Sequence, residues 1–362
     1  MNIKGNLKYL LAGSIVFLLV YLFLAAVPLG PDFYFEPSWV RQITVADTAE
    51  VETPRNDAFP ENAIPFHLGN TFGYFTPDGT IVLSRTSTER IIVSRHGWAT
   101  YPHDAQQTTI SFTDNTADVL IKEPGYVHLD KDRIYLFHPG GNRVSSLSEK
   151  AETLWTREHT APITAFNSSP AGTVIGYADG NLTAVSPTGE ILFTFWPGGS
   201  DHQIILGTAI SGDGEFIACI SGIDRQRFIV AQRMSNQYRI LYHTYLEGNL
   251  RRQLYCTFDD RGKHVFFETA SGLGIFDSNT LESRILQIPG TIVSTGEIPG
   301  NSVFTVLSKN GNEFTLSAIE KPDHIVGSAI FPGTDAFLVQ QGTTLFLGID
   351  SRITRIDIRG FE

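Results

Sequence analysis

Past residue 65 the chain carries short apolar runs rather than a helical pattern. Runs rich in Val, Ile, Phe, Tyr and Thr are cut by Gly, Asp, Asn and Pro, and no 3.6-residue apolar period is sustained. In SSPAGTVIGYADGNLTAVSPTGEILFTFWPGG, residues 168–199, tight-turn signals separate three such runs. The pattern predicts strands over 173–178, 181–186 and 190–195, with a fourth over 163–168. Together they form one small antiparallel sheet.

This unit recurs along the chain. Shifted by 38 residues, 135–157 lies on 173–195 without a gap, so that Val144 meets Leu182 and Trp155 meets Phe193. The predicted hairpins begin near residues 80, 134, 173, 215, 263, 302 and 335. Their mean spacing of about 42 residues is typical of a propeller blade.

A lone four-stranded sheet with two apolar faces cannot bury both, but a ring of such sheets can. The sequence therefore predicts an all-β β-propeller over 66–362, with seven four-stranded blades. Eight blades are the alternative, because the first interval is long enough to hide one. A pair of β-sandwiches is the rival architecture, and the regular period disfavours it. Residues 352–360 alternate well enough to be an outer strand.

The repeat resembles a known family. The stretch YADGNLTAVSPTGEILFTF resembles the repeat of quinoprotein-type (PQQ-like) propellers, and Pro-Asp-Gly at 77–79 and Gly-Asp-Gly at 212–214 resemble WD40-type turns. The resemblance implies a propeller but no particular ligand. At the level of fold the chain also resembles the propeller lipoprotein that assists outer-membrane β-barrel assembly, although the lipid-modified Cys is missing.

The N-terminal region differs in character. Lys4 and Lys8 precede nineteen uncharged, mostly apolar residues, 9–27, long enough to cross a bilayer as a helix. We expect a cytoplasmic tail over 1–8 and an uncleaved transmembrane signal-anchor helix over 9–27. A cleaved signal peptide is the rival interpretation. The flanking charges place the remainder outside the cytoplasm, at a bacterial inner membrane facing the periplasm. Residues 28–65, acidic and rich in Pro, are predicted to be a tether, and the alternative for 39–45 is a paired strand.

The charge of the chain argues against one class of partner, and the two cysteines leave two pairing states open. The net charge is −11 and no basic run is present, which argues against nucleic acid as a partner. Cys219 and Cys256 both lie in apolar runs, so two buried thiols or one disulfide are open possibilities.

The sequence contains no linear catalytic or metal-binding signature. Neither H-x-x-x-H nor C-x-x-C occurs, and there is no G-x-S-x-G or G-x-x-x-x-G-K. We therefore expect no catalytic residues, no bound metal and no cofactor such as a quinone. Propeller enzymes can still gather carboxylates or His from several blades at the central channel.

One stretch stands out as a candidate binding loop. RHGWATYPHDAQQ, 95–107, breaks the strand rhythm and gathers His96, Trp98, Tyr101, His103 and Asp104. Loops on rigid scaffolds often bind partners, and exposed aromatic residues make good anchors. The alternative is that Trp98 and Tyr101 pack between blades. A second, weaker candidate is GIDRQRF, 222–228, a basic hairpin tip that would suit an acidic partner or be a solvated turn.

The leading hypothesis is a membrane-anchored, extracytoplasmic propeller that binds other envelope proteins as a scaffold, for instance in envelope assembly. The alternatives are a hydrolase or lyase acting on glycans or small molecules at the central channel, and a ligand sensor.

Overall fold

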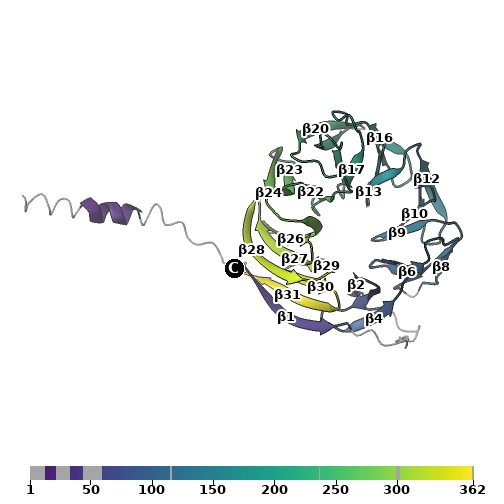
Figure 1. Ribbon diagram of the computed structural model, residues 1–362, viewed down its shortest axis with the longest axis horizontal. Helices are drawn as coiled ribbons and strands as arrows, with labels where there is room; N and C mark the ends of the chain where they lie inside the picture. The colour runs from purple at the N-terminus through teal and green to yellow at the C-terminus, as the bar shows by residue number, and fades with distance from the viewer. Residues whose placement is uncertain are drawn as a thin grey trace, which may run out of the picture.

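The strands of the chain are arranged as radial sheets around a central axis (Figure 1). The computed structural model describes residues 13–21, 33–43, 59–114, 116–235, 237–298 and 302–360. Within these ranges there are eight antiparallel sheets, seven with four strands and one with three. The protein is an all-β propeller of eight blades.

The first four blades comprise fifteen strands in chain order, beginning with the three-stranded sheet. These are β2 (Ile64–Leu68), β3 (Thr71–Phe75) and β4 (Ile81–Thr86); β5 (Arg90–Val93), β6 (Gly97–Tyr101), β7 (Thr108–Phe112) and β8 (Val119–Ile121); β9 (Tyr126–Asp130), β10 (Arg133–Phe137), β11 (Arg143–Leu147) and β12 (Thr153–Glu158); β13 (Ile163–Ser169), β14 (Gly172–Tyr177), β15 (Leu182–Val185) and β16 (Ile191–Phe195), with β1 left for the last blade.

The other four blades follow in the same order and close the ring. These are β17 (Ile205–Ile210), β18 (Phe216–Ser221), β19 (Arg227–Met234) and β20 (Gln237–Tyr245); β21 (Cys256–Phe258), β22 (His264–Thr269), β23 (Gly272–Asp277) and β24 (Glu282–Leu286); β25 (Thr291–Glu297), β26 (Val303–Asn310), β27 (Glu313–Glu320) and β28 (His324–Pro332); β29 (Ala336–Gln341), β30 (Thr344–Ile349), β31 (Arg352–Arg359) and β1 (Tyr34–Gln42).

The blade β13–β16 confirms the repeat unit expected from the sequence. Its four strands match the four predicted ones, and its turns use the predicted residues. Gly180 and Gly189 have φ angles of 82° and 85°, which only glycine adopts without strain. The Asp179 carboxylate accepts a hydrogen bond of 3.0 Å from the backbone N–H of Asn181, which fixes the turn.

The core lies between neighbouring blades. Strands β17 and β18 are buried at every position, whereas the outer strand β16 is half exposed. One apolar cluster joins β18 and β19 to β22 and β23 of the next blade. Its centre is a stack of Phe228 on Phe267, with ring centroids 3.8 Å apart. Face-to-face packing of blades therefore buries both faces of each sheet, as the repeat argument requires.

The prediction of seven blades is wrong, and the alternative of eight is confirmed, because one predicted hairpin joins strands of two different blades. The two runs within the predicted hairpin 80–95 are β4 and β5, and these strands belong to different sheets. The connection 87–89 has the length of a hairpin turn, yet it links one blade to the next. Alternation in the sequence identifies strands, but it does not say which strands pair.

In the three-stranded blade, the first strand β2 runs in the opposite direction to the first strands of the two neighbouring blades. The Gly69 amide after β2 donates to the Asp335 carboxylate just before β29, and Arg95 after β5 donates to the Glu61 carbonyl just before β2. Strand β2 therefore runs opposite to the innermost strands β5 and β29 beside it. Within the described residues, this blade has no counterpart of the usual first strand. Pro65 in β2 has no amide hydrogen to offer an added strand.

The ring is closed by the N-terminal strand β1, which pairs with β31 beside the C-terminus (Figure 1).

This closure corrects two predictions about the ends of the propeller. Residues 352–360 form the third strand of the last blade, not its outer strand. The predicted tether 28–65 includes β1, as well as the first residues of β2, so the propeller begins earlier than residue 66. Phe35 and Trp39 hold β1 because both pack against the apolar core.

The predicted tail 1–8 and transmembrane helix 9–27 lie only partly within the described residues. Residues 13–21 are helical, whereas the tail 1–8 and the rest of the predicted span lie outside the described ranges. No helix in the described part of the chain is long and apolar enough to cross a membrane.

Candidate functional site

The two ends of the propeller are chemically distinct. In the blade β17–β20, Ile205, Ser221, Arg227 and Tyr245 lie side by side from the innermost strand to the outermost one. The chain enters and leaves the blade at this end, so the links between blades lie on the same face of the ring. We call this end the connector face, and the other end the opposite face.

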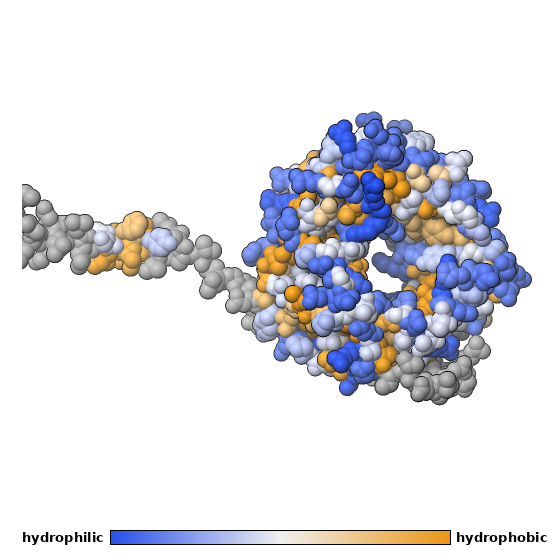
Figure 2. Space-filling view, viewed as in Figure 1, coloured by the Kyte–Doolittle hydropathy of each residue, from blue (hydrophilic) through white to orange (hydrophobic). Residues whose placement is uncertain are grey.

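The connector face carries two adjoining pockets at the mouth of the central channel. Their volumes are about 450 and 310 Å³, and they share Phe166 and Gln253. The space-filling view shows the opening at the centre of the ring (Figure 2). We call the two pockets together the channel-mouth site. Its other described lining residues are Tyr126, His128, Phe137, Gly141, Ile163, Thr164, Ala165, Thr208, Arg252, Leu254, Tyr255, Cys256, Glu268, Thr291 and Ile292.

One wall of this site is aromatic. Antiparallel pairing of β9 with β10 places Tyr126 opposite Phe137 and His128 opposite Tyr135. Phe166, from β13 of the next blade, meets Phe137 and Tyr135 edge-on, with ring centroids 4.9 Å away in both cases. The Tyr126 side chain remains 42% exposed, so the wall is open to the solvent. Aromatic faces of this kind bind apolar and planar groups.

The imidazole of His128 lies within the aromatic wall. Its ring is 5.8 Å from that of Phe166 and makes no hydrogen bond to another described residue. Burial lowers the pKa of His128, and the nearby Arg133 lowers it further, against the opposing effect of Asp130. The ring is therefore neutral near pH 7. It offers one donor and one acceptor to a bound group.

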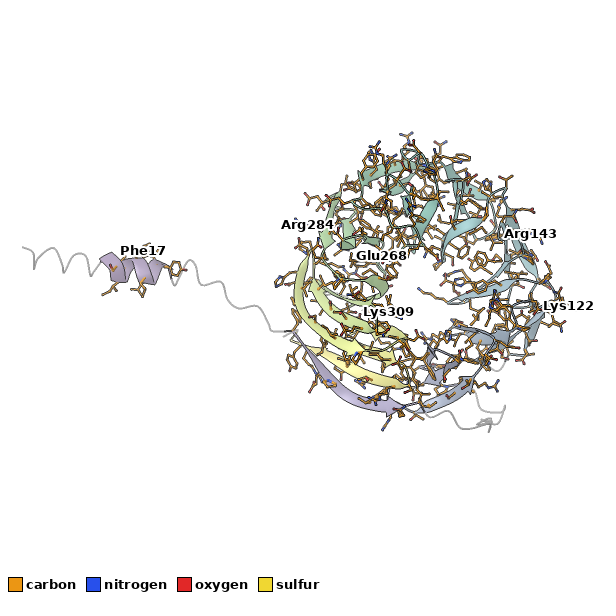
Figure 3. All side chains as sticks on the ribbon, in the orientation of Figure 1. Phe17, Lys122, Arg143, Glu268, Arg284 and Lys309 are labelled. Carbon is orange, nitrogen blue, oxygen red and sulfur yellow. The ribbon has the colours of Figure 1, made fainter. Side chains whose placement is uncertain are left out.

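The other wall is polar and internally neutralised. Arg252 donates two hydrogen bonds to Glu268, at 2.8 and 2.7 Å, and its Nη2 also donates to Thr291. The Glu268 side chain is only 1% exposed and additionally accepts from the amides of Tyr255 and Ile292. It lies on the inner side of the ring (Figure 3). This bidentate pair raises the pKa of Arg252, and it joins the blade of β22 to the blade of β25.

The predicted loop 95–107 contains a strand. Residues Gly97–Tyr101 form β6, in which burial alternates along the strand. The Trp98 ring packs against Phe59 and Tyr74, and Tyr101 is 2% exposed. The Tyr101 hydroxyl accepts from the Val127 amide at 2.9 Å. Both aromatic residues therefore pack inside the propeller, as the alternative interpretation held.

The polar members of that prediction do not come together. His96 lies in the turn before β6 on the opposite face, whereas His103 and Asp104 follow β6 on the connector face. A five-residue strand separates these positions by about 16 Å. His103 instead contacts Arg90, with 2.6 Å between the imidazole and guanidinium nitrogens. The described residues include no group of three or more His, Cys, Asp or Glu that could hold a metal ion.

A charged network on the opposite face was not found from the sequence. Asp259 contacts His264 at 2.7 Å, and Lys321 reaches Glu297 at 2.8 Å and Asp259 at 3.7 Å. Burial raises the pKa of Asp259, but hydrogen bonds from the His264 side chain and from backbone amides outweigh it, so the net shift is downward. The charges neutralise one another across two blades, which indicates a structural role.

The two cysteines are free, which decides between the alternatives left open by the sequence. Cys219 and Cys256 are both buried. Burial raises the pKa of the Cys219 thiol to about 12, and it also raises that of Cys256. Neither thiol is therefore ionised near neutral pH.

The channel-mouth residues gave no linear signal. His128 lies in β9 and Gln253 lies in the distant link between β20 and β21, and neither belongs to a recognisable motif. Only closure of the ring brings them to one channel.

Comparison with known proteins agrees with this architecture. A family model described as "beta-propeller protein" matches residues 1–362. An uncharacterised protein of Treponema pallidum (strain Nichols) is 41% identical over 365 residues, covering 99% of this chain and 96% of the relative.

Solved structures share the fold at low sequence identity. BamB from Moraxella catarrhalis has a TM-score of 0.62 at 12% identity, with 90% of this chain and 100% of that chain covered. The computationally designed Ika8 protein has a TM-score of 0.60 at 11% identity, covering 83% and 95% of the two chains. Apo AztD from Citrobacter koseri has a TM-score of 0.53 at 13% identity, covering 79% and 87%.

Proposed function

The chain belongs to a family of β-propeller proteins, and from this premise we propose that it is a membrane-anchored scaffold that binds partner proteins of the cell envelope. The channel-mouth site is the docking position in this proposal. A short apolar or aromatic segment of the partner inserts there between the aromatic wall and the Arg252–Glu268 wall.

The neutral, aromatic lining of the channel mouth carries the proposal. Tyr126, Phe137 and Phe166 supply open aromatic area, and neutral His128 supplies hydrogen-bonding groups without a charge to desolvate. The pocket volumes suit a few side chains of a partner segment. Rigid aromatic pockets of this kind are typical of protein-binding hot spots.

The carboxylate at the channel mouth is arranged for structure rather than for proton transfer. A channel enzyme would need at least one free acid or base near a second one. Glu268 is the only carboxylate among the described lining residues, and its oxygens accept from Arg252 and two backbone amides. This observation favours binding over the hydrolase or lyase alternative.

Anchoring through residues 9–27, with the propeller in the periplasm, is part of the same proposal. The helical residues 13–21 expose consecutive apolar side chains, among them Phe17, which is 72% exposed (Figure 3). Such a surface is stable in lipid rather than in water.

The docking position is tested with a photoreactive p-benzoylphenylalanine in place of Tyr126 in the full chain, irradiated in native membranes. We expect one defined envelope protein to become cross-linked. The matched control places the same residue at Tyr34, which is 58% exposed on the outer strand β1 and should not give this product. No product at position 126, or the same products at both positions, would contradict docking at the channel mouth.

A further inference from the structure

A second surface of the connector face is built from aromatic and arginine side chains. Trp196 directly follows the outer strand β16, and Tyr245 ends the neighbouring outer strand β20. Arg225 and Arg227 come from the turn between β18 and β19 and from the first residue of β19. We call these four residues the rim surface. It lies at the outer edge of the propeller, whereas the channel-mouth site lies at the centre.

Side chains of the rim surface contact one another in the unbound protein. Arg225 lies over the Tyr245 ring at 4.6 Å, and Arg227 lies over the same ring at 5.3 Å. Arg227 Nη1 also donates to the Pro197 carbonyl at 2.9 Å. Gly199 allows this approach, because a Cβ at that position would lie 2.8 Å from Arg227 Nη1. These contacts restrict the two arginines and Tyr245 in the unbound protein, so less of their side-chain entropy is lost on binding.

The two guanidinium groups are not neutralised. Among the described residues, neither Arg225 nor Arg227 has a carboxylate within ion-pair distance, although other arginines of the chain do, including Arg133, Arg252, Arg284, Arg355 and Arg359. The neighbouring Asp224 carboxylate pairs with neither arginine. Its carboxylate accepts from the Ser200 hydroxyl and from the amides of Asp201 and His202. These contacts hold the pKa of Asp224 well below its usual range.

The aromatic members remain accessible. Trp196 is 52% exposed and Tyr245 is 47% exposed. Trp, Tyr and Arg are the residue types most enriched at the energetic centres of protein interfaces. The surface therefore combines apolar contact area with two positive charges, in a protein whose net charge is −11.

We propose that the rim surface docks an acidic segment of a partner protein. Carboxylates of the segment pair with the outer edges of Arg225 and Arg227, and an adjacent apolar side chain covers Trp196 and Tyr245. An anionic membrane is the less suitable occupant, because two cations on an acidic protein give weak electrostatic attraction to a lipid surface. This inference does not depend on the channel-mouth site.

The test uses the full chain in detergent and two short fluorescent peptides, one of alternating Glu and Leu and one of alternating Lys and Leu. We expect the Glu peptide to bind and the Lys peptide not to bind. Arg225→Glu and Trp196→Ala should each weaken binding of the Glu peptide by about tenfold or more. Arg225 is exposed and holds no neighbouring loop, so its replacement should leave the fold unchanged, as circular dichroism can verify.

The matched control is Arg233→Glu, an exposed arginine at the other end of β19 on the opposite face. It makes the same charge change in the same blade and should leave binding unaltered. Equal binding of the two peptides, or equal effects of Arg225→Glu and Arg233→Glu, would overturn the proposal. Arg225-dependent binding to phosphatidylglycerol vesicles without binding of the Glu peptide would overturn it in favour of a lipid headgroup.

Discussion

At the scale of single residues, the environment of a side chain decides its role more than its type does. His96 and His103 stood out in the sequence, yet each occupies an exposed turn at a different end of the ring. His128 did not stand out, and it lies in an aromatic wall at the channel mouth. His128 differs from His96 and His103 because it is largely buried, and the local sequence around His128 does not predict this burial.

His128 should make the stability of the protein depend on pH. Its pKa is lowered by folding, so the unfolded chain takes up a proton that the folded chain resists as the pH falls through about 6.5. Stability is therefore highest above this value and declines on acidification from pH 7 towards pH 5. Thermal melts of the wild type across this interval should show the decline, and His128→Gln should make it shallower.

The control for this prediction is His67→Gln, which changes an exposed histidine on β2. It makes the same substitution outside the aromatic wall, so comparing the two pH profiles shows whether any flattening is specific to position 128. His138, whose pKa burial also lowers, should account for part of the decline that remains in His128→Gln. A pH profile unchanged by His128→Gln would show that this imidazole is not held in its neutral form by the fold.

At the scale of elements, β1 links the first and last parts of the chain. It completes the last blade by pairing with β31, and it also contacts the first blade through Trp39. The Trp39 ring packs against Phe75 and Phe346, and its indole N–H donates to the Pro77 carbonyl. One strand thus joins both sides of the closure, which is how a propeller avoids an open seam.

Trp39→Ala should lower the free energy of unfolding by roughly 2 kcal/mol, somewhat less than for a fully buried aromatic residue because Trp39 is half-buried. Val40→Ala, on the same strand with a side chain that is 56% exposed, should change it by only a few tenths of that amount. Urea unfolding of the two variants makes the comparison. Equal midpoints would mean that Trp39 does not hold the closure together.

Removing 352–362 should be more severe than Trp39→Ala. The sequence suggested that this segment forms an outer strand, but β31 lies between β30 and β1. Its loss would leave β1 without a partner strand among the described residues and would open the ring.

At the scale of the whole molecule, the two proposed binding surfaces lie on one face of the propeller, and a neutralised charge network lies on the other. Both proposed surfaces lie on the connector face, so a single partner could reach the channel mouth and the rim surface together. Linking two weak contacts in this way raises the overall affinity without any new contact.

The proposed anchor gives a prediction at the same scale. The full chain should remain in the membrane pellet after a carbonate wash, because an apolar helix of the length of 9–27 inserts stably in lipid. A chain lacking 9–27 should be released, with its propeller still folded by circular dichroism. Recovery of the full-length product in the soluble fraction, with a new N-terminus beyond residue 27, would support a cleaved signal peptide instead.

The sequence by itself determined the repeat and the strands of the regular blades. Strand alternation and tight turns are local properties, so the blade β13–β16 could be read from 163–195 before any contact was known. The same local information also predicted that apolar residues on both faces of a sheet require neighbouring sheets on each side.

Pairing and position around the ring were decided only by the tertiary structure. The runs on either side of 87–89 look like one hairpin but belong to two blades, and 97–101 look like a loop but form a strand in which burial alternates. The channel-mouth site joins Phe166 of one blade to Gln253, which lies in a link between two others. Contacts between distant segments depend on how the ring closes, and closure is a property of the whole chain that no window of sequence contains.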